Sequence, residues 1–241
     1  MSNVFRIWVF LSSSPLLWLT VTVGVYLGSL WLHERSGGHS AVNPVLISVV
    51  ALVCVLLVTN TPYPVYFDGA KFVHFLIGPA TVALAVPLYG QLARLKRMWL
   101  PIGVALVVGS ATAIVSAVAI GHLLGASRES LLSLAPKSST LPIAMSVADR
   151  IGGLPALAAM AVAATGISGA IMAKRLLDLL GLRDPAVRGF AVGITAHAVG
   201  TARAFQVGSV NGAFAALALA LNGVATALLM PLLIKLLAPL L

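Results

Sequence analysis

Two cationic side chains lie in or beside interruptions of apolar segments, and hydroxyl groups accompany both. Lys137 lies within residues 136–142, which read Pro-Lys-Ser-Ser-Thr-Leu-Pro, and Arg203 ends the stretch 193–203. Where a helix breaks inside a membrane, backbone N–H groups and the positive end of the helix dipole become available to a ligand. Neither stretch contains a carboxylate, so this chemistry favours a small anion. The candidate substrate-binding residues are Lys137, Ser138, Ser139, Thr140, His197, Thr201 and Arg203.

Proline and glycine residues predict helix breaks at three places. The first is at residues 78–87, and the other two are the stretches that contain Lys137 and Arg203. Backbone that leaves helix geometry at membrane depth is tolerated only where protein buries it or water reaches it. We therefore expect the three breaks to converge on one binding site near the middle of the membrane. The candidate break-forming residues are Pro79, Pro87, Pro136, Pro142 and Gly200.

Each candidate also has an ordinary structural explanation. Lys137 would extend to the membrane interface if its segment crossed outright, and Arg203 could be a loop cation at the end of its helix. His197 is more simply a core histidine bonded to a backbone carbonyl than a proton or hydroxyl partner of a substrate. Pro79 and Pro87 could do no more than kink a helix, which membrane helices tolerate.

The sequence contains no recognisable enzyme constellation. No apolar segment carries a pair of carboxylates, cysteine and histidine residues lack metal-ligand spacing, and no phosphate-binding glycine loop is present. Cys54 is the only cysteine, so no internal disulfide can form. We expect a protein that is not an enzyme and that uses no cofactor and no metal ion.

The composition requires lipid as the surrounding solvent. Of the 241 residues, 60% are hydrophobic and 9% are charged, with a mean hydropathy of +1.05, whereas about a quarter of the residues of a soluble domain are charged. The net charge of +9 comes from basic residues that lie mostly between apolar runs, which is typical of topology signals and headgroup contact. We predict an all-α fold, a polytopic transmembrane helical bundle with broken and re-entrant helices, in a single domain of residues 1–241.

Eight apolar segments approach the roughly 20 residues that a membrane-crossing helix needs. The first continues to about Leu32, beyond the apolar core of a signal peptide and without a small-residue cleavage site, so we expect a retained helix. The eight segments are residues 8–32, 43–60, 70–93, 98–125, 128–148, 154–178, 186–204 and 208–239.

The basic loops set the predicted orientation. Residues 94–97 and 174–188 are the richest in Lys and Arg, so both loops should be cytoplasmic. Three segments lie between them, and three crossings would place the two loops on opposite sides. We therefore predict that the interrupted segment 128–148 is a re-entrant pair of half-helices. The N-terminus is then outside and the loop 33–39 inside.

A weak internal similarity suggests inverted repeats, residues 1–125 and 126–241. Asp68 precedes Gly-Ala at the start of one segment, and Asp184 precedes Pro-Ala at the start of another. The predicted orientation puts Asp68 outside and Asp184 inside, so the two halves would be inverted. Inverted repeats around a midplane site occur in many secondary transporters. The alternative is a chain without repeats.

Several motifs resemble those of the LrgB/CidB family of membrane proteins. Residues 134–145 resemble the family's P-K-S-x-T-x-P-I-A signature, and residues 196–203, which read AHAVGTAR, resemble a second family stretch. Residues 151–155 and 79–89 resemble two more. The resemblance covers most of the chain, from about residue 40 onward.

The resemblance implies two classes of function. The family is described as holin/antiholin-like, modulating murein hydrolase export and autolysis with a small LrgA/CidA membrane partner. Its plant chloroplast relatives carry glycolate and glycerate, and bacterial members are linked to pyruvate. The resemblance thus implies a two- or three-carbon carboxylate as substrate and the bacterial cytoplasmic (inner) membrane as location.

Two features depart from the family pattern. The family often has an acidic residue three positions after the arginine that corresponds to Arg203, where this chain has Gln206. A coupling proton carried by that carboxylate would have no counterpart here. Asp149 and Arg150 replace small polar residues of the family pattern. They could form a substitute charged pair, or they could mark a solvated segment end.

We predict a secondary carrier for a small organic anion, in which Lys137 and Arg203 contact the carboxylate. The expected partners are a small carboxylate, membrane lipid, a small LrgA/CidA-like membrane protein and further copies of the chain, but no nucleic acid. The alternatives are a holin/antiholin-like effector of murein hydrolase export and a subunit that is inactive without its partner.

Overall fold

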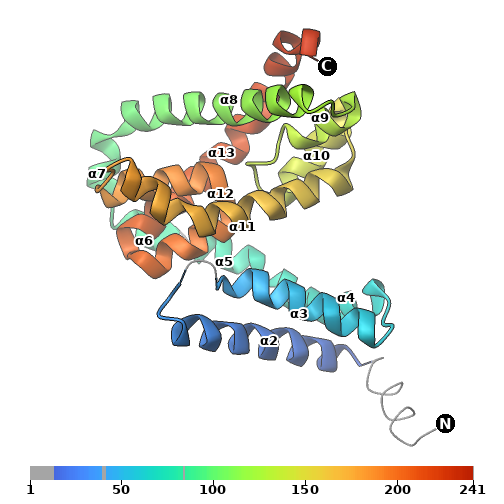
Figure 1. Cartoon of the computed structure of the whole chain (residues 1–241). Helices are drawn as coiled ribbons and strands as arrows, with labels where there is room; N and C mark the ends of the chain where they lie inside the picture. Colours follow the sequence, from blue (N-terminus) through green and yellow to red (C-terminus); the bar gives the residue numbers. More distant parts are fainter. Residues whose placement is uncertain (1–13, 40–41, 84, 241) are drawn as a thin grey trace, which may run out of the picture. The chain divides into compact units, whose positions relative to one another are not determined.

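The described residues form an all-α protein, as the sequence predicts. The computed structural model describes residues 14–39, 42–83 and 85–240, and within these ranges it contains helices and no strand. Its contacts divide the chain into two compact units, of which the first ends at Ala83 and the second follows it. Figure 1 colours both units along the sequence. Residues 8–13 of the first predicted segment lie outside the described ranges.

The described part of the first unit contains four helices that begin at prolines or follow turns. They are α2 (Pro15–Arg35), α3 (Pro44–Val58), α4 (Tyr63–Phe75) and α5 (Ile77–Ala83). Proline is suited to the first turn of a helix because its missing N–H would have no partner there. The side chain of Asn43 caps α3 by accepting bonds from the N–H groups of Val45 and Leu46 at 2.9 and 3.1 Å.

Small and aromatic residues pack α2 against α3 and α4. A Cβ atom at Gly69 would collide with the backbone of Pro15, so the glycine allows α4 to approach α2 closely. Nearby, the rings of Trp18 and Tyr66 meet edge to face with centroids 5.8 Å apart. The Ser48 hydroxyl bonds another hydroxyl on α2 across the α2–α3 contact.

The predicted break at residues 78–87 falls on two short helices, and Pro79 lies in the first turn of one of them. α4 ends at Phe75, and α5 begins at Ile77. Pro79 has no N–H to bond the carbonyl of Phe75, which accounts for the end of the α4 ladder. Pro79 belongs to the first unit, whereas Pro87 lies in α6 (Ala85–Tyr89) of the second unit.

The second unit combines three long helices with several short ones. Among the described residues, five helical runs are long and apolar enough to cross a membrane: α2, the run Tyr63–Tyr89 that comprises α4, α5 and α6, and the three long helices Trp99–Leu123, Pro155–Leu179 and Ser209–Leu236 of this unit. Its helices are α6, α7 (Leu92–Arg97), α8 (Trp99–Leu123), α9 (Arg128–Leu134), α10 (Leu141–Ile151), α11 (Pro155–Leu179), α12 (Pro185–Val207), α13 (Ser209–Leu236) and the 3₁₀ turn η1 (Ala238–Leu240).

Helices α9 and α10 form a first hairpin of half-length helices. They contain 7 and 11 residues, whereas a crossing helix needs about 20. Residues 135–140 form the hairpin tip, so the predicted break ends at Thr140. Helix α10 begins at Leu141, and Pro142 lies in its first turn instead of extending the break. At the other end of α10, Gly152 has a φ of 88°, the left-handed conformation that ends a helix.

Helix α12 reverses at His197 and forms a second hairpin. His197 has φ 39° and ψ −131°, which is not helical. Val192 and Ala204, which would lie about 18 Å apart along a straight helix, belong to one packed cluster. The break is therefore at His197, and Gly200 lies in the second arm, where it packs on Ala196. The two arms are Pro185 to Ala196 and Ala198 to Val207.

An ion pair confirms that the two basic loops lie at the same end of the second unit. Arg94 Nη2 is 2.6 Å from Asp184 Oδ2. Partial desolvation raises the pKa of Asp184, but bonds from the N–H groups of Val187 and Ala186 and the charge of Arg94 outweigh it, so the pKa is lowered.

In Figure 1, α7 lies at one end of the long helix α11, and α9 and α10 lie at the other. The hairpin α9–α10 thus returns to the end where it starts, as predicted.

Candidate anion site

The tips of both hairpins meet at Asn222, a buried residue in the middle of α13. Its Nδ2 donates hydrogen bonds to the carbonyl oxygen of Ser138, at 2.8 Å, and to that of Ile194, at 3.1 Å. Its Oδ1 accepts a bond from the hydroxyl of Ser110 at 2.6 Å. One amide therefore connects the first hairpin, the second hairpin, α8 and α13.

The break at His197 explains why the Ile194 carbonyl needs a partner from outside its helix. In an unbroken helix this carbonyl would accept from the N–H of Ala198, four residues later. Because the chain reverses between them, the carbonyl is left at the end of the first arm, and Asn222 satisfies it. Ser138 likewise lies where α9 has ended and α10 has not begun, so its carbonyl is outside any helix ladder.

A cavity of about 570 Å³ opens beside the tip of the first hairpin. This volume is within the range of small-molecule sites, which are mostly apolar with a few polar groups. Residues of α8, of the first arm of α12 and Phe214 of α13 supply most of the wall, and no carboxylate is among the described residues that line it. We call it the central cavity. Its polar lining residues are Thr112, Ser116, Lys137, Ser138, Thr165 and Thr195.

Two of the predicted hydroxyl groups are buried and have no hydrogen-bond partner. Ser139 is 1% exposed and Thr201 is 3% exposed, and neither side-chain oxygen has a partner among the described residues. A buried polar atom is normally paired, so each exception indicates strain or a missing water or ligand. Thr140, the next residue at the first tip, is the N-cap of α10, but its side chain makes no capping bond.

His197 has the structural role that the sequence favoured. Its ring is 4% exposed, and its Nε2 lies 2.9 Å from the carbonyl oxygen of Val162 on α11. A carbonyl can only accept, so Nε2 carries the proton of this bond. A Cβ atom at Gly166 would collide with the same ring. The ring therefore fixes the second tip against α11.

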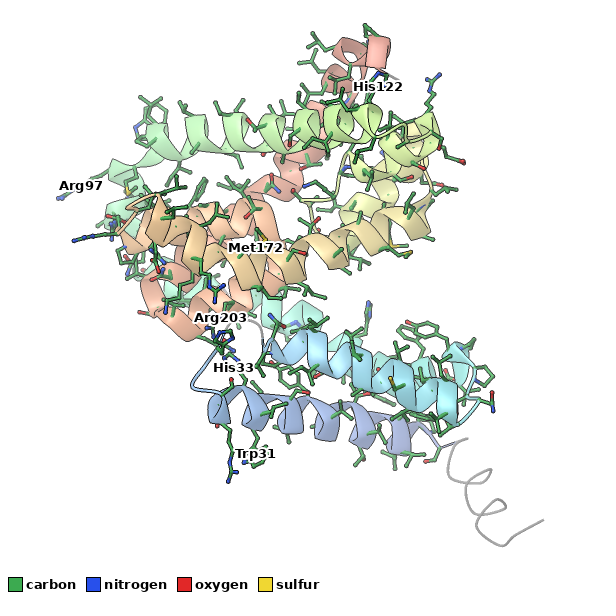
Figure 2. All side chains as sticks on the ribbon, in the orientation of Figure 1. Trp31, His33, Arg97, His122, Met172 and Arg203 are labelled. Carbon is green, nitrogen blue, oxygen red and sulfur yellow. The ribbon has the colours of Figure 1, made fainter. Side chains whose placement is uncertain are left out.

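Arg203 does not join Lys137 in the central cavity. It lines a second cavity of about 180 Å³, together with Lys174, Arg188 and Asn211. Its Nη1 donates a 2.8 Å bond to Oε1 of Gln206. In Figure 2, Arg203 lies toward the end of the unit marked by Arg97 and away from His122. Because the chain reverses at His197, Arg203 is carried away from the tip. We call this second cavity the basic cavity.

The structure thus brings two of the three predicted breaks together. The tips around Ser138 and Ile194 share Asn222, and Pro136 at the first tip is fully buried. Pro87 lies in α6, which packs on α13. Pro79 belongs to the first unit.

Sequence reasoning missed Asn222, the residue that links the tips. The signal was present as an amide followed by Gly223 inside the long apolar segment 208–239. A polar side chain at membrane depth is expensive unless it is bonded to protein or faces a cavity. The segment contains no charge until Lys235, so the sequence predicts a simple crossing helix there.

Other charged groups have positions away from the tips. Asp149 and Arg150 are exposed near the end of α10, which agrees with a solvated segment end. Within residues 14–39, 42–83 and 85–240, no three His, Cys, Asp or Glu side chains cluster in a way that could hold a metal ion.

Comparison with known proteins gives matches over almost the full chain. The profile described as "LrgB-like family" matches residues 22–236. The chain is 34% identical to the Bacillus subtilis protein YwbG over 217 residues, which is 90% of this chain and 96% of YwbG. It is 31% identical over 219 residues to the antiholin-like protein LrgB of Bacillus mycoides, covering 90% and 95% of the two chains. No solved structure matches the chain.

Proposed function

The chain belongs to the LrgB-like family of multi-pass membrane proteins, and we propose from that premise that it carries small organic anions across the bacterial cytoplasmic membrane. The proposed binding site is the central cavity, beside the tip of the first hairpin. Lys137 would contact the carboxylate there, and nearby hydroxyl groups would bond the rest of the substrate.

The observation that carries the proposal is the environment of Lys137. The residue is half-buried in a break between two half-length helices, and no carboxylate is among the described residues lining its cavity. A cation at membrane depth is costly and is usually paired or directed at a water-filled path. A substrate carboxylate would supply the missing negative charge.

The backbone at the tip adds a second attraction for an anion. α10 begins directly after the tip, and no side chain caps its first turn. The N-terminus of a helix carries a partial positive charge and unpaired N–H groups. Ser138 lines the cavity, and the partnerless hydroxyl of Ser139 follows it in the chain. A carboxylate at Lys137 would therefore have hydroxyl and N–H donors within the same tip.

The substrate class comes from the resemblance to carriers of glycolate, glycerate and pyruvate. The cavity has one cationic lining residue and a mostly apolar wall, which suits a monoanion better than a dianion or a larger polyanion. Gln206 bonds Arg203 through an amide oxygen. Unlike a carboxylate, an amide does not take up and release a proton near neutral pH. Our proposal therefore includes no proton coupling at this position.

A second candidate function rests on the names of relatives. Proteins of Bacillus mycoides and Bacillus cereus that are about 30% identical to this chain are named antiholin-like protein LrgB. On this reading the chain would modulate murein hydrolase export with a small LrgA/CidA-like membrane protein and would carry no substrate. Such an effector has no need of a cation beside a cavity at the tip of a half-helix.

Flux into proteoliposomes separates the two functions. The purified full-length chain would be reconstituted alone and with a small LrgA-like protein, and uptake of radiolabelled glycolate, glycerate and pyruvate would be followed. The carrier proposal expects saturable uptake above that of empty vesicles for at least one of these anions. Uptake equal to that of empty vesicles, both alone and with the partner, would reject the carrier and favour the effector.

A further inference from the structure

The basic cavity of the second unit gathers three cationic side chains from three segments. Lys174 comes from α11, Arg188 from the first arm of α12 and Arg203 from its second arm, and Asn211 of α13 completes the polar lining. Along a straight helix, Arg188 and Arg203 would lie more than 20 Å apart. Only the reversal at His197 places both at one cavity.

We propose that the basic cavity is a second anion site, which binds a phosphate group. The source would be either the headgroup of an anionic lipid or a soluble phosphate. This site is separate from the carboxylate site of the central cavity. The first arm of α12 lies between them, because its residues Val187 and Phe190 line the central cavity while Arg188 and Gly189 line the basic one.

The described contacts at the basic cavity include one ion pair with a carboxylate. Arg188 is held in place by Asp178 Oδ1, at 2.6 Å, and by the carbonyl oxygen of Leu182, at 2.8 Å. Asp178 is the one carboxylate in a described ion pair with these three cations. Gln206 bonds Arg203 with a neutral oxygen. Lys174 lines the cavity and takes part in none of the described ion pairs, so an anion would find a cation there to bind.

The shape and position of the cavity fit a phosphate group. Its volume of about 180 Å³ equals that of about six liquid water molecules at ~30 Å³ each, which is enough for one phosphate. Guanidinium groups bind phosphate through paired N–H donors. The loop 174–188 marks the basic end of the unit, and basic pockets between helices at the cytoplasmic surface are typical sites for lipid phosphates.

Two variants and one neighbouring control test the site in the full-length chain. Lys174→Gln removes a lining cation, and Gln206→Glu places a carboxylate beside Arg203. Arg175→Gln removes a positive charge at the next residue, which is also exposed but does not line the cavity. Native mass spectrometry would measure phosphatidylglycerol binding against phosphatidylcholine, and calorimetry would measure inorganic phosphate binding.

The proposal expects Lys174→Gln and Gln206→Glu each to weaken phosphate binding about fivefold or more, with Arg175→Gln close to wild type. This pattern with phosphatidylglycerol assigns a lipid, and the same pattern with inorganic phosphate alone assigns a soluble ligand. No binding of either probe above phosphatidylcholine, or equal loss in all three variants, would overturn the proposal. So would the same pattern obtained with glycolate instead of phosphate. Lys137→Met should leave phosphate binding unchanged, so this site can fail or stand independently of the carrier function.

Discussion

The hydroxyl of Ser110 donates a 2.6 Å hydrogen bond to Oδ1 of Asn222, which joins α8 to α13 across 112 residues of sequence. The amide nitrogen of Asn222 bonds the tips of both hairpins. The two tips are therefore held at a fixed position beside the central cavity. The side chain of Asn222 on α13 thus holds together the elements that form the proposed site.

Replacing Asn222 by Leu should destabilise the chain more than removing its partner on α8. Asn222→Leu deletes three hydrogen bonds, which at ~0.6 kcal/mol each in membrane proteins amounts to about 2 kcal/mol. Ser110→Ala deletes one of them, with an expected loss of about 0.6 kcal/mol. Unfolding of the detergent-solubilised variants, followed by fluorescence, would measure both. Equal losses in the two variants would show that the bonds to Ser138 and Ile194 contribute nothing.

The partnerless hydroxyls of Ser139 and Thr201 should matter for transport and not for stability. Ser139→Ala and Thr201→Val remove oxygens that bond no described residue, so the free energy of unfolding should change by less than about 0.5 kcal/mol. If a substrate or its water uses these hydroxyls, uptake should fall about tenfold.

Ser133 provides the contrasting control for that experiment. Its hydroxyl donates to the carbonyl of Glu129 and accepts from the N–H of Leu154, both at 2.7 Å. Ser133→Ala should therefore lower stability by about 1 kcal/mol. Loss of stability in Ser139→Ala as large as that in Ser133→Ala would mean that Ser139 has a structural partner.

The packing of His197 on α11 predicts a strong effect at Gly166. A methyl group there would collide with the His197 ring and displace it from the carbonyl of Val162, which should cost about 1–3 kcal/mol. Gly103→Ala on α8 is the matched control, because no atom lies within 4 Å of a Cβ at that position. The control should be neutral or stabilising by up to about 1 kcal/mol. Thermal unfolding that ranks the two variants in the opposite order would contradict the described second tip.

The first hairpin predicts a specific labelling pattern in oriented vesicles. In a Cys54→Ser background, single cysteines at the exposed positions Arg128 and Arg150 should react with an impermeant maleimide from the same side. Cysteines at Lys96 and Arg183 should react from the other side, since the ion pair between the basic loops places them at one end. Opposite-side reaction of the first pair would mean that α9 and α10 together cross the membrane.

The re-entrant hairpin was predictable from the sequence because basic loops indicate which ends of the segments lie on the same side of the membrane. Two basic loops with three segments between them required one segment that does not cross, and Pro136 and Lys137 marked which segment it was. The ion pair between Arg94 and Asp184 places the two basic loops at one end of the second unit, in agreement with that count. Charge and proline positions are local properties, so a sequence shows them directly.

The second hairpin was only partly predictable. The break within residues 193–203 was expected, but the residue that reverses the chain is His197, a non-glycine residue with positive φ and no proline beside it. Such a conformation persists only when surrounding packing imposes it, here the close approach of Gly166 and the bond to Val162. Because these contacts are long-range, the sequence alone could not show that Arg203 turns away from Lys137.

The division into two units and the predicted repeats follow different boundaries. The contacts separate the chain after Ala83, whereas the predicted repeats meet between residues 125 and 126. Within the second unit, a hairpin precedes a long helix twice, as α9 and α10 precede α11 and as the arms of α12 precede α13. The inverted repeats remain a prediction of the sequence.

The most direct test of the central claim is anion uptake by Lys137→Met compared with Lys235→Met in proteoliposomes. Both variants remove one lysine charge, but Lys235 lies in the last turn of α13 and lines neither cavity. The carrier account predicts that Lys137→Met lowers the uptake of glycolate, glycerate or pyruvate by about tenfold or more. The uptake by Lys235→Met should stay close to that of the wild type. Wild-type uptake by Lys137→Met would contradict it.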